Sequence, residues 1–159
     1  MEIFATKNLI IRNLKSADFP ILKALYELND KDLESVNELK VAVEKAKNDD
    51  FNSEGVKRFA IEKNGKTIGH LGLAFDKPYV SFSYKFFEDE DTRINAQDLI
   101  FTLVRYVHKL YPHREINVAA EKFDYKKRSV LENLSFNRKS FNAELNAYTY
   151  SIFVINPNK

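Results

Sequence analysis

Hydrophobic residues recur with a helical spacing of three and four positions in four parts of the chain. These parts cover residues 21–28, 33–46, 92–110 and 125–134. Ser16 or Asp18 can cap the first helix, and Asp124 can cap the last. The long third run ends before Pro112, because proline cannot continue a helix. The pattern therefore predicts about four helices.

Stretches rich in β-branched and aromatic residues, some of them alternating with polar ones, lie between these helices. They cover residues 8–14, 58–63, 67–75, 79–87, 116–120 and 148–154. The dipeptide Asn64-Gly65 separates two of them and favours a type I′ turn, so residues 58–75 are predicted to form a β-hairpin. The order of elements indicates one sheet that is covered by helices.

Composition narrows the class of protein. The length of 159 residues suits a single domain over residues 1–159, and 44% hydrophobic residues with only 4 glycines and 4 prolines indicate a folded chain. The absence of cysteine excludes disulfides, a thiol nucleophile and thiolate metal ligands, and with 3 histidines we expect no metal site. No apolar stretch is long enough for a leader or a membrane span, so we expect a soluble, cytoplasmic protein that contacts no membrane.

A net charge of +2 argues against nucleic acid as a general partner. A local alternative remains, because a basic block at residues 126–128 lies beside Phe123 and Tyr125, which could stack on bases. The aromatic residues also permit a homodimer, but no pattern specifies one.

Three phrases of the sequence resemble the GNAT superfamily of N-acetyltransferases, in particular the branch that acetylates ribosomal-protein N-termini and similar amines. Residues 9–14 with the following Asp18 resemble its first strand, and residues 59–73 resemble its glycine-containing hairpin, the most specific match. Residues 130–136 are similar to the phrase that ends its last helix and opens the next strand, with Ser135 in place of a glycine.

The resemblance implies an α/β (α+β) fold in which a mixed, mostly antiparallel, twisted sheet of about seven strands is flanked by about four helices. In this fold the fourth and fifth strands splay apart to admit acetyl-CoA. The implied activity is that of a transferase, an acetyl-CoA dependent N-acetyltransferase (acyltransferase) acting on a primary amine, either a peptide N-terminus or a small amine. The alternative is an inactive protein or binding module on the same fold that has lost acetyl-CoA.

The resemblance also suggests where the cofactor would bind. The implied cofactor-binding residues are Phe86, Phe87, Thr92, Arg93, Ile94, Asn95, Asp124 and Lys127. Asp89, Thr92 and Ile94 replace the Gln or Arg and the two glycines of the family's phosphate-binding turn, so we expect weaker cofactor binding. The acidic residues 88–91 would repel phosphate, or they simply complement the start of the helix.

No catalytic residue can be assigned from the sequence. Lys127 and Leu131 stand where the family has hydroxyl side chains, and Ser81 stands where it often has an acidic base. Candidate replacements are His70 as a proton acceptor, and Tyr125 and Ser129 as proton donors. The acceptor amine is expected beside the N-terminal helices and the fourth strand, at Tyr26, Phe51, Tyr79, Ser81 and Ser83.

Overall fold

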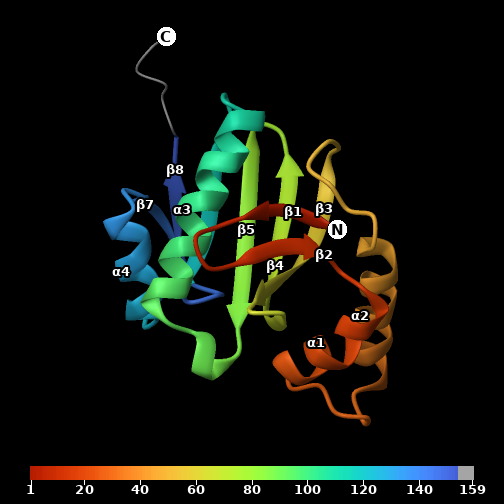
Figure 1. Ribbon diagram of the computed structural model, residues 1–159. Coiled ribbons are helices and arrows are strands. Elements are labelled where there is room, and N and C mark those ends of the chain that lie inside the picture. The colour runs from red at the N-terminus through yellow and green to blue at the C-terminus, as the bar shows by residue number, and fades with distance from the viewer. Residues whose placement is uncertain (154–159) are drawn as a thin grey trace.

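The computed structural model describes residues 1–153, and its centre is one mixed β-sheet (Figure 1). In this part of the chain the sheet has eight strands in the order β1-β2-β3-β4-β5-β6-β8-β7. The strands are β1 (Glu2–Ala5), β2 (Ile10–Asn13), β3 (Gly55–Lys63), β4 (Lys66–Asp76), β5 (Tyr79–Phe86), β6 (Glu115–Glu121), β7 (Asn137–Asn142) and β8 (Ala147–Ile152). Neighbouring strands are antiparallel except for β5 and β6, which are parallel. The expected mixed, mostly antiparallel α+β fold is confirmed.

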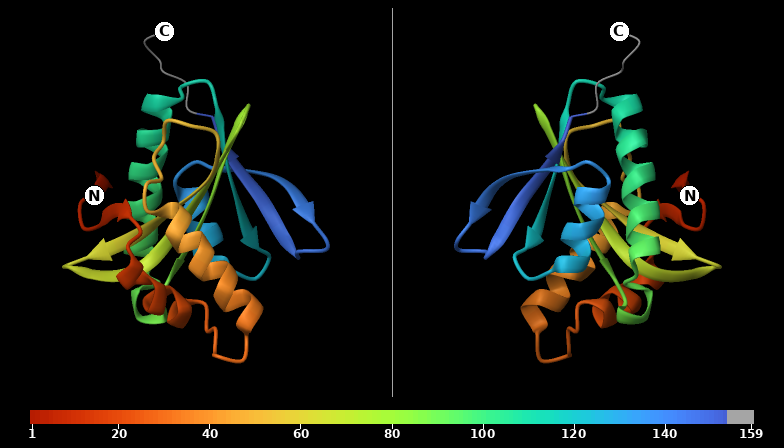
Figure 2. Two further views of the ribbon diagram at one scale, coloured as in Figure 1. Left: turned by 90° about the vertical axis from the view of Figure 1, so that its right-hand side faces the viewer. Right: turned by 90° about the vertical axis from the view of Figure 1, so that its left-hand side faces the viewer.

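Helices cover both faces of the sheet. They are α1 (Phe19–Leu25), α2 (Leu33–Ala46), α3 (Arg93–Leu110) and α4 (Tyr125–Asn133), with short 3₁₀ turns at η1 (Ser16–Asp18) and η2 (Glu88–Glu90). Figure 2 shows α2 and α3 on opposite sides of the sheet. Within residues 1–153, no helix combines the length and the apolar character needed to cross a membrane.

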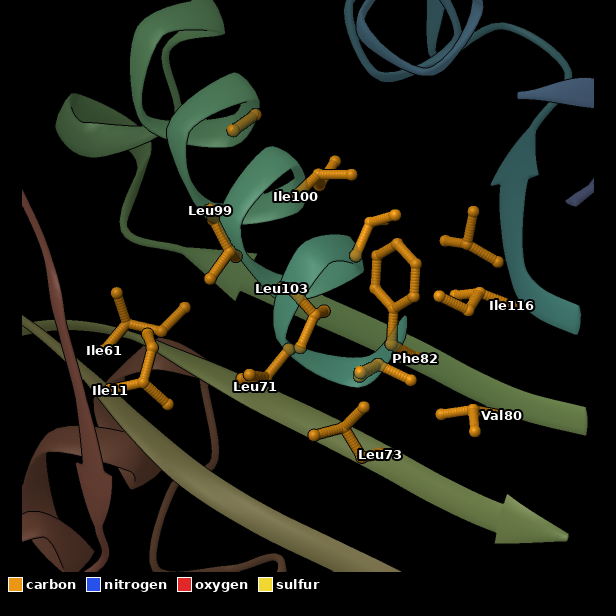
Figure 3. Close-up of a cluster of buried hydrophobic side chains, with 14 of the residues drawn as sticks. Ile11, Ile61, Leu71, Leu73, Val80, Phe82, Leu99, Ile100, Leu103 and Ile116 are labelled. Atoms are coloured by element: carbon orange, nitrogen blue, oxygen red, sulfur yellow. The ribbon is translucent and has the colours of Figure 1, made fainter. Parts of the chain in front are cut away.

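The larger hydrophobic core lies between the sheet and α3. Figure 3 shows Leu71 and Phe82 of the sheet together with Leu99 and Leu103 of α3 in this cluster. Full burial of each such side chain stabilises the fold by about 1.5–3 kcal/mol. A smaller cluster, which includes Leu22, lies between the other face and helices α1 and α2. The two clusters explain the predicted alternation, since successive strand residues face different helices.

The hairpin of β3 and β4 forms where the sequence predicts it. Asn64 and Gly65 have φ angles of 52° and 78°, the positive values that both central residues of a type I′ turn require. Lys63 pairs with Lys66 across this turn. β3 begins at Gly55, three residues before the predicted start at Arg58.

The sheet agrees with the expected number of about seven strands and has one more, β1, which was not predicted. β1 has four residues and only Phe4 is buried, so no alternation is long enough to predict a strand. Its hydrogen bonds with β2 make it the edge of the sheet. The splay implied between the fourth and fifth strands therefore falls between β5 and β6. The predicted last strand reaches Val154, which lies outside the described residues.

The expected side-chain cap of the first helix is also wrong, since α1 begins at Phe19 without one. Asp18 instead binds Arg12 in two hydrogen bonds, with Nη1 to Oδ2 at 2.8 Å and Nη2 to Oδ1 at 3.0 Å. The backbone N–H of Lys15 and the hydroxyl of Thr67 also donate to this carboxylate, at 2.8 and 3.0 Å. Burial by itself would raise the pKa of Asp18, but these donors, Arg12 first, hold it below its usual value. The ion pair thus ties β2 and η1 to the start of β4.

Candidate functional site

Strands β5 and β6 diverge along their length. They pair only from Tyr79 with Glu115 to Phe82 with Val118, although β5 continues to Phe86 and β6 to Glu121. Figure 2 shows the two strands separating. A cleft with a volume of about 520 Å³ lies in this gap. It is lined by Tyr84, Lys85, Phe86, Asp91, Ala96, Ala119, Glu121, Asp124, Lys126, Lys127, Leu145 and Ala147.

The unpaired length of β5 is one wall of this cleft. Beyond Phe82 the register with β6 ends, so backbone groups on that edge of β5 are not taken up by a neighbouring strand. Such an edge can hydrogen-bond an extended ligand that carries amide groups, as a further strand would. The cleft can therefore hold a long, narrow molecule.

Two lysines of α4 bring positive charge to the cleft. Nζ of Lys127 lies 4.8 Å from the ring centroid of Tyr84. Burial lowers the pKa of Lys127, while Asp124, Glu121 and Asp91 oppose this shift. Burial also raises the pKa of Tyr84, so its hydroxyl stays protonated at neutral pH. The wall next to α4 thus combines an ammonium group with a protonated phenol.

The neighbouring Lys126 bridges α4 to the turn before α3. Its Nζ donates to the backbone oxygen of Asp91 at 2.6 Å and lies 3.7 Å from the Oδ2 atom of the same residue. Both residues line the cleft, so this contact is part of its wall. It also neutralises one carboxylate of the acidic block at residues 88–91.

The N-terminus of α3 adjoins the same turn. Thr92 caps the helix, because its Oγ1 accepts from the N–H of Asn95 at 3.1 Å, and its backbone oxygen accepts from Ala96. The side-chain amide of Asn95 donates to the backbone oxygen and to Oε2 of Glu90, both at 2.9 Å. Within residues 1–153 this leaves the N–H groups of Arg93 and Ile94 for an anionic ligand.

A second cavity lies on the face of the sheet that carries α1 and α2. It has a volume of about 220 Å³ and is lined by Val56, Arg58, Gly72, Leu73, Ala74, Ser81, Phe82 and Ser83. On the same face, the Tyr26 hydroxyl lies 2.6 Å from Nδ1 of the buried His70. Burial, followed by the charge of Arg58, lowers the pKa of His70 to about 4. His70 is therefore neutral at pH 7.

Solved structures share this arrangement across almost the whole chain. An acetyltransferase of the GNAT family from Bacillus anthracis matches with a TM-score of 0.72 at 17% identity, over 96% of this chain and 98% of that chain. The ribosomal-protein α-N-acetyltransferase RimL, solved in complex with coenzyme A, matches with a TM-score of 0.76 at 15% identity, over 97% and 98%. The chain has the GNAT fold. A variant of spermidine N-acetyltransferase SpeG from Vibrio cholerae also matches, with a TM-score of 0.72 at 19% identity, over 91% and 93%.

The likeness lies in the fold rather than in the sequence. No protein-family profile matches the chain, and no curated protein matches it in sequence. The three phrases that resemble GNAT proteins nevertheless occupy structural positions that explain them: Arg12 and Asp18 form the buried ion pair, and Asn64-Gly65 form the hairpin turn. Ser135, which stands in place of a glycine, has a φ angle of 71°, a conformation that glycine adopts without strain.

The structure brings only part of the predicted cofactor set into the cleft of the GNAT fold. Phe86, Asp124 and Lys127 line it. Thr92 and Asn95 form the helix cap next to it, with Asn95 itself buried. The backbone N–H groups of Arg93 and Ile94 complete that cap region.

The side chains of three predicted residues lie elsewhere. Phe87 packs against the smaller hydrophobic cluster, which lies between the sheet and helices α1 and α2. Arg93 lines a separate hollow that also includes Tyr125 and Ser129. Ile94, which stands in place of a glycine of the phosphate-binding turn, is 72% exposed, and its side chain does not line the cleft.

The three candidate proton-transfer residues also lie outside the cleft. Tyr125 and Ser129 do not line the cleft, and Nε2 of His70 is buried without a hydrogen-bond partner in the described part of the chain. With its pKa lowered to about 4, His70 is a weak base at neutral pH. Phe51, expected near the acceptor, is buried against Phe59 in the core on the other face of the sheet.

Several residues of the cleft were not predicted. Ala119, Glu121, Leu145 and Ala147 come from β6, from the turn between β7 and β8, and from β8 itself, and no local pattern connects them. The sequence had suggested two other lining residues near the cofactor phosphates, Lys126 in the basic block at residues 126–128 and Asp91 in the acidic block at residues 88–91. No group of three or more His, Asp or Glu side chains placed to hold a metal occurs within residues 1–153.

Gly69 sets how closely β4 and β5 approach beside the cleft. A Cβ atom at Gly69 would lie 2.5 Å from the backbone oxygen of Lys85 and 3.1 Å from Cδ1 of Phe86. We expect Gly69→Ala to lower the free energy of unfolding by about 1–3 kcal/mol, because the strands must separate. Urea denaturation measures this change.

Gly72→Ala is the matched control for this prediction. Its new Cβ would lie 3.1 Å from the Ser83 hydroxyl, a side-chain atom that can rotate, and 4.0 Å from the nearest backbone oxygen. We expect a smaller loss of stability for this variant. Equal losses for Gly69→Ala and Gly72→Ala would contradict the argument from backbone contact.

Proposed function

We propose that the protein is an acetyl-CoA dependent N-acetyltransferase that acts on a primary amine. The observation that carries this proposal is the cleft between the diverging strands β5 and β6, in a chain with the GNAT fold. The neighbours support the same chemistry, because RimL acetylates a ribosomal protein and was solved with coenzyme A, and SpeG is a spermidine N-acetyltransferase.

The residues of the cleft fit acetyl-CoA. The unpaired edge of β5 suits the amide groups of the pantetheine arm. The phosphates of acetyl-CoA would bind to Lys126, Lys127 and the N–H groups of Arg93 and Ile94. The carboxylates of Asp91, Glu121 and Asp124 would repel the phosphates, although Lys126 neutralises Asp91. When bound, the thioester supplies the activated acetyl group.

Residues of the chain would position the cofactor and the amine, and one of them, Lys127, would hold a proton in the cleft. Tyr84 and Phe86 line the cleft with aromatic surface, and their ring centroids lie 5.6 Å apart. Lys127 holds a proton at Nζ, and because burial lowers its pKa, it releases this proton more readily than an exposed lysine. The second cavity opens on the other face of the same strand, beside Ser81 and Ser83, and is the proposed site of the acceptor amine.

Calorimetric titration of the wild-type chain with acetyl-CoA tests the cofactor. We expect saturable binding, and we expect Lys127→Gln to weaken it about tenfold, because an ammonium–phosphate contact is lost. Lys109→Gln removes an exposed lysine at the far end of α3 and is the matched control. No heat from wild type at millimolar acetyl-CoA would contradict the proposal.

Release of the free thiol of coenzyme A in the presence of amines tests the transfer step. We expect release that depends on the amine, with an acetylated product that mass spectrometry detects. Binding of acetyl-CoA without any transfer to peptide N-termini or polyamines would favour the inactive alternative on the same fold.

A further inference from the structure

The cavity on the α1–α2 side of the sheet carries one unmatched charge. Among its lining residues only Arg58 is charged. Within residues 1–153 the guanidinium of Arg58 has neither a hydrogen-bond nor an ion-pair partner, although the residue is half-buried. The N–H donors of this guanidinium are therefore free to hydrogen-bond a ligand.

One acidic residue beside Arg58, Asp49, binds the main chain rather than the guanidinium. Oδ2 of Asp49 accepts a hydrogen bond from the backbone N–H of Arg58 at 2.8 Å, so it serves the main chain. Burial, followed by the charge of Arg58, lowers the pKa of His70, whereas burial raises the pKa of Tyr26 and Arg58 only opposes that shift. The guanidinium is therefore close enough to this pair for its charge to act on it, and Arg58 lines the cavity on the same face of the sheet.

Hydroxyl groups surround the same cavity. Ser81 and Ser83 of β5 are exposed and line it together with Gly72. A Cβ atom at Gly72 would approach the Ser83 hydroxyl to 3.1 Å, so the glycine leaves this hydroxyl open to a ligand. A planar guanidinium with two hydroxyl groups matches the geometry of a carboxylate, which accepts two parallel hydrogen bonds.

A second cation, Lys85, lies on the same face of the sheet. Lys85, which pairs with His70 across β4 and β5, carries its Nζ 5.5 Å from the Tyr26 ring centroid and forms no ion pair among the described residues. The acidic residues Glu34 and Glu38 line a wider hollow between α2 and β3, which meets the cavity at Val56 and Arg58. Among these groups only Arg58 also lines the smaller cavity, and the carboxylates of α2 line the wider hollow alone.

We propose that Arg58, together with Ser81 and Ser83, binds a carboxylate of the acceptor, so that the preferred substrate is a primary amine that also bears a carboxylate. This inference rests on the proposed acetyl transfer, and it names the substrate class of that site. The carboxylate belongs either to a free amino acid or to an acidic side chain near a peptide N-terminus. Polyamines, which carry no carboxylate, are poor substrates.

Matched pairs of probes test the inference by binding, without cofactor. The dipeptide amides Ser-Asp and Ser-Asn differ only in one carboxylate near a peptide N-terminus, and free alanine and alaninamide differ only in the carboxylate of an amino acid. Spermidine represents an amine without a carboxylate. We expect at least one carboxylate probe to bind wild type about tenfold more tightly than its amide, and the pair that differs identifies the source.

Two substitutions of Arg58 test whether this residue causes the preference for the carboxylate probe. Arg58→Gln is expected to abolish the preference for the carboxylate probe, and Arg58→Lys to retain part of it, because lysine keeps the charge but loses the paired donors. Arg105→Gln removes an exposed arginine of α3 on the opposite face and should change nothing. Circular dichroism confirms that the variants are folded.

The outcomes separate this inference from the proposed function. Equal binding of both members of each pair, or an unchanged preference in Arg58→Gln, would overturn it. Acetyl transfer without a carboxylate preference would overturn the inference alone. A preference that depends on Arg58 in a chain that transfers no acetyl group would support the carboxylate site and reject the enzyme.

Discussion

Replacing Asp18 with asparagine is expected to lower the free energy of unfolding by about 3 kcal/mol. Asp18 and Arg12 are 2% and 8% exposed, and removal of one partner leaves the other charge in a buried place. Arg12 retains Glu62, whose Oε1 lies 3.1 Å from its Nε, which limits the loss to the lower end of the range for buried ion pairs. Chemical denaturation at pH 7 measures the change.

Asp30→Asn is the matched control. Asp30 also pairs with a cation, Lys23, but its side chain is 94% exposed, so its removal should have a much smaller effect. The pH dependence gives a second check. The pKa of Asp18 is held below its ordinary value of 3.8, so its contribution is complete above that pH and is lost as the pH falls further. A loss for Asp18→Asn no greater than that for Asp30→Asn would contradict the prediction.

Acidification from pH 6.5 to about 4 is expected to destabilise the protein through His70 by about 3 kcal/mol. The unfolded chain binds a proton near the ordinary pKa of 6.5, whereas burial and Arg58 lower the pKa of His70 in the folded chain to about 4. Between these values the unfolded state binds more protons, so stability falls as the pH falls and is constant above pH 6.5.

Denaturation curves at a series of pH values, with His70→Gln as the test variant, measure this contribution. The variant should lose the dependence between pH 6.5 and 4, although its stability at pH 7 is lower because the contact with Tyr26 changes. His108→Gln, in the last turn of α3, should retain the wild-type dependence. Proton NMR of the His70 ring in wild type should show no titration between pH 8 and 5, and a midpoint near pH 6.5 would disprove the prediction.

The two predicted effects occupy separate pH ranges on different parts of the sheet. His70 acts between pH 6.5 and 4, and Asp18 acts below its ordinary pKa of 3.8. Neither group lines the cleft between β5 and β6.

Local structure was predictable wherever a few neighbouring residues decide it. The turn at Asn64-Gly65 depends on two φ angles, and the end of α3 depends on the proline that follows Tyr111. Alternation along β5 also follows from the chain, because successive side chains of a strand must face opposite sides. β1 escaped prediction because four residues with one buried side chain carry no period.

The sites depend on residues that are distant in the sequence, and their distances arise from strand register and helix packing. The sequence alone determined the helices, the hairpin and most of the sheet, together with the arginine and the acidic residue whose pairing holds β2 to η1. Only the tertiary structure decided which side chains line the cleft between β5 and β6, that Phe51 enters the core, and that the charge of Arg58 acts on His70. Local periodicity carries no information on such contacts, because each one joins segments whose spacing along the chain is arbitrary.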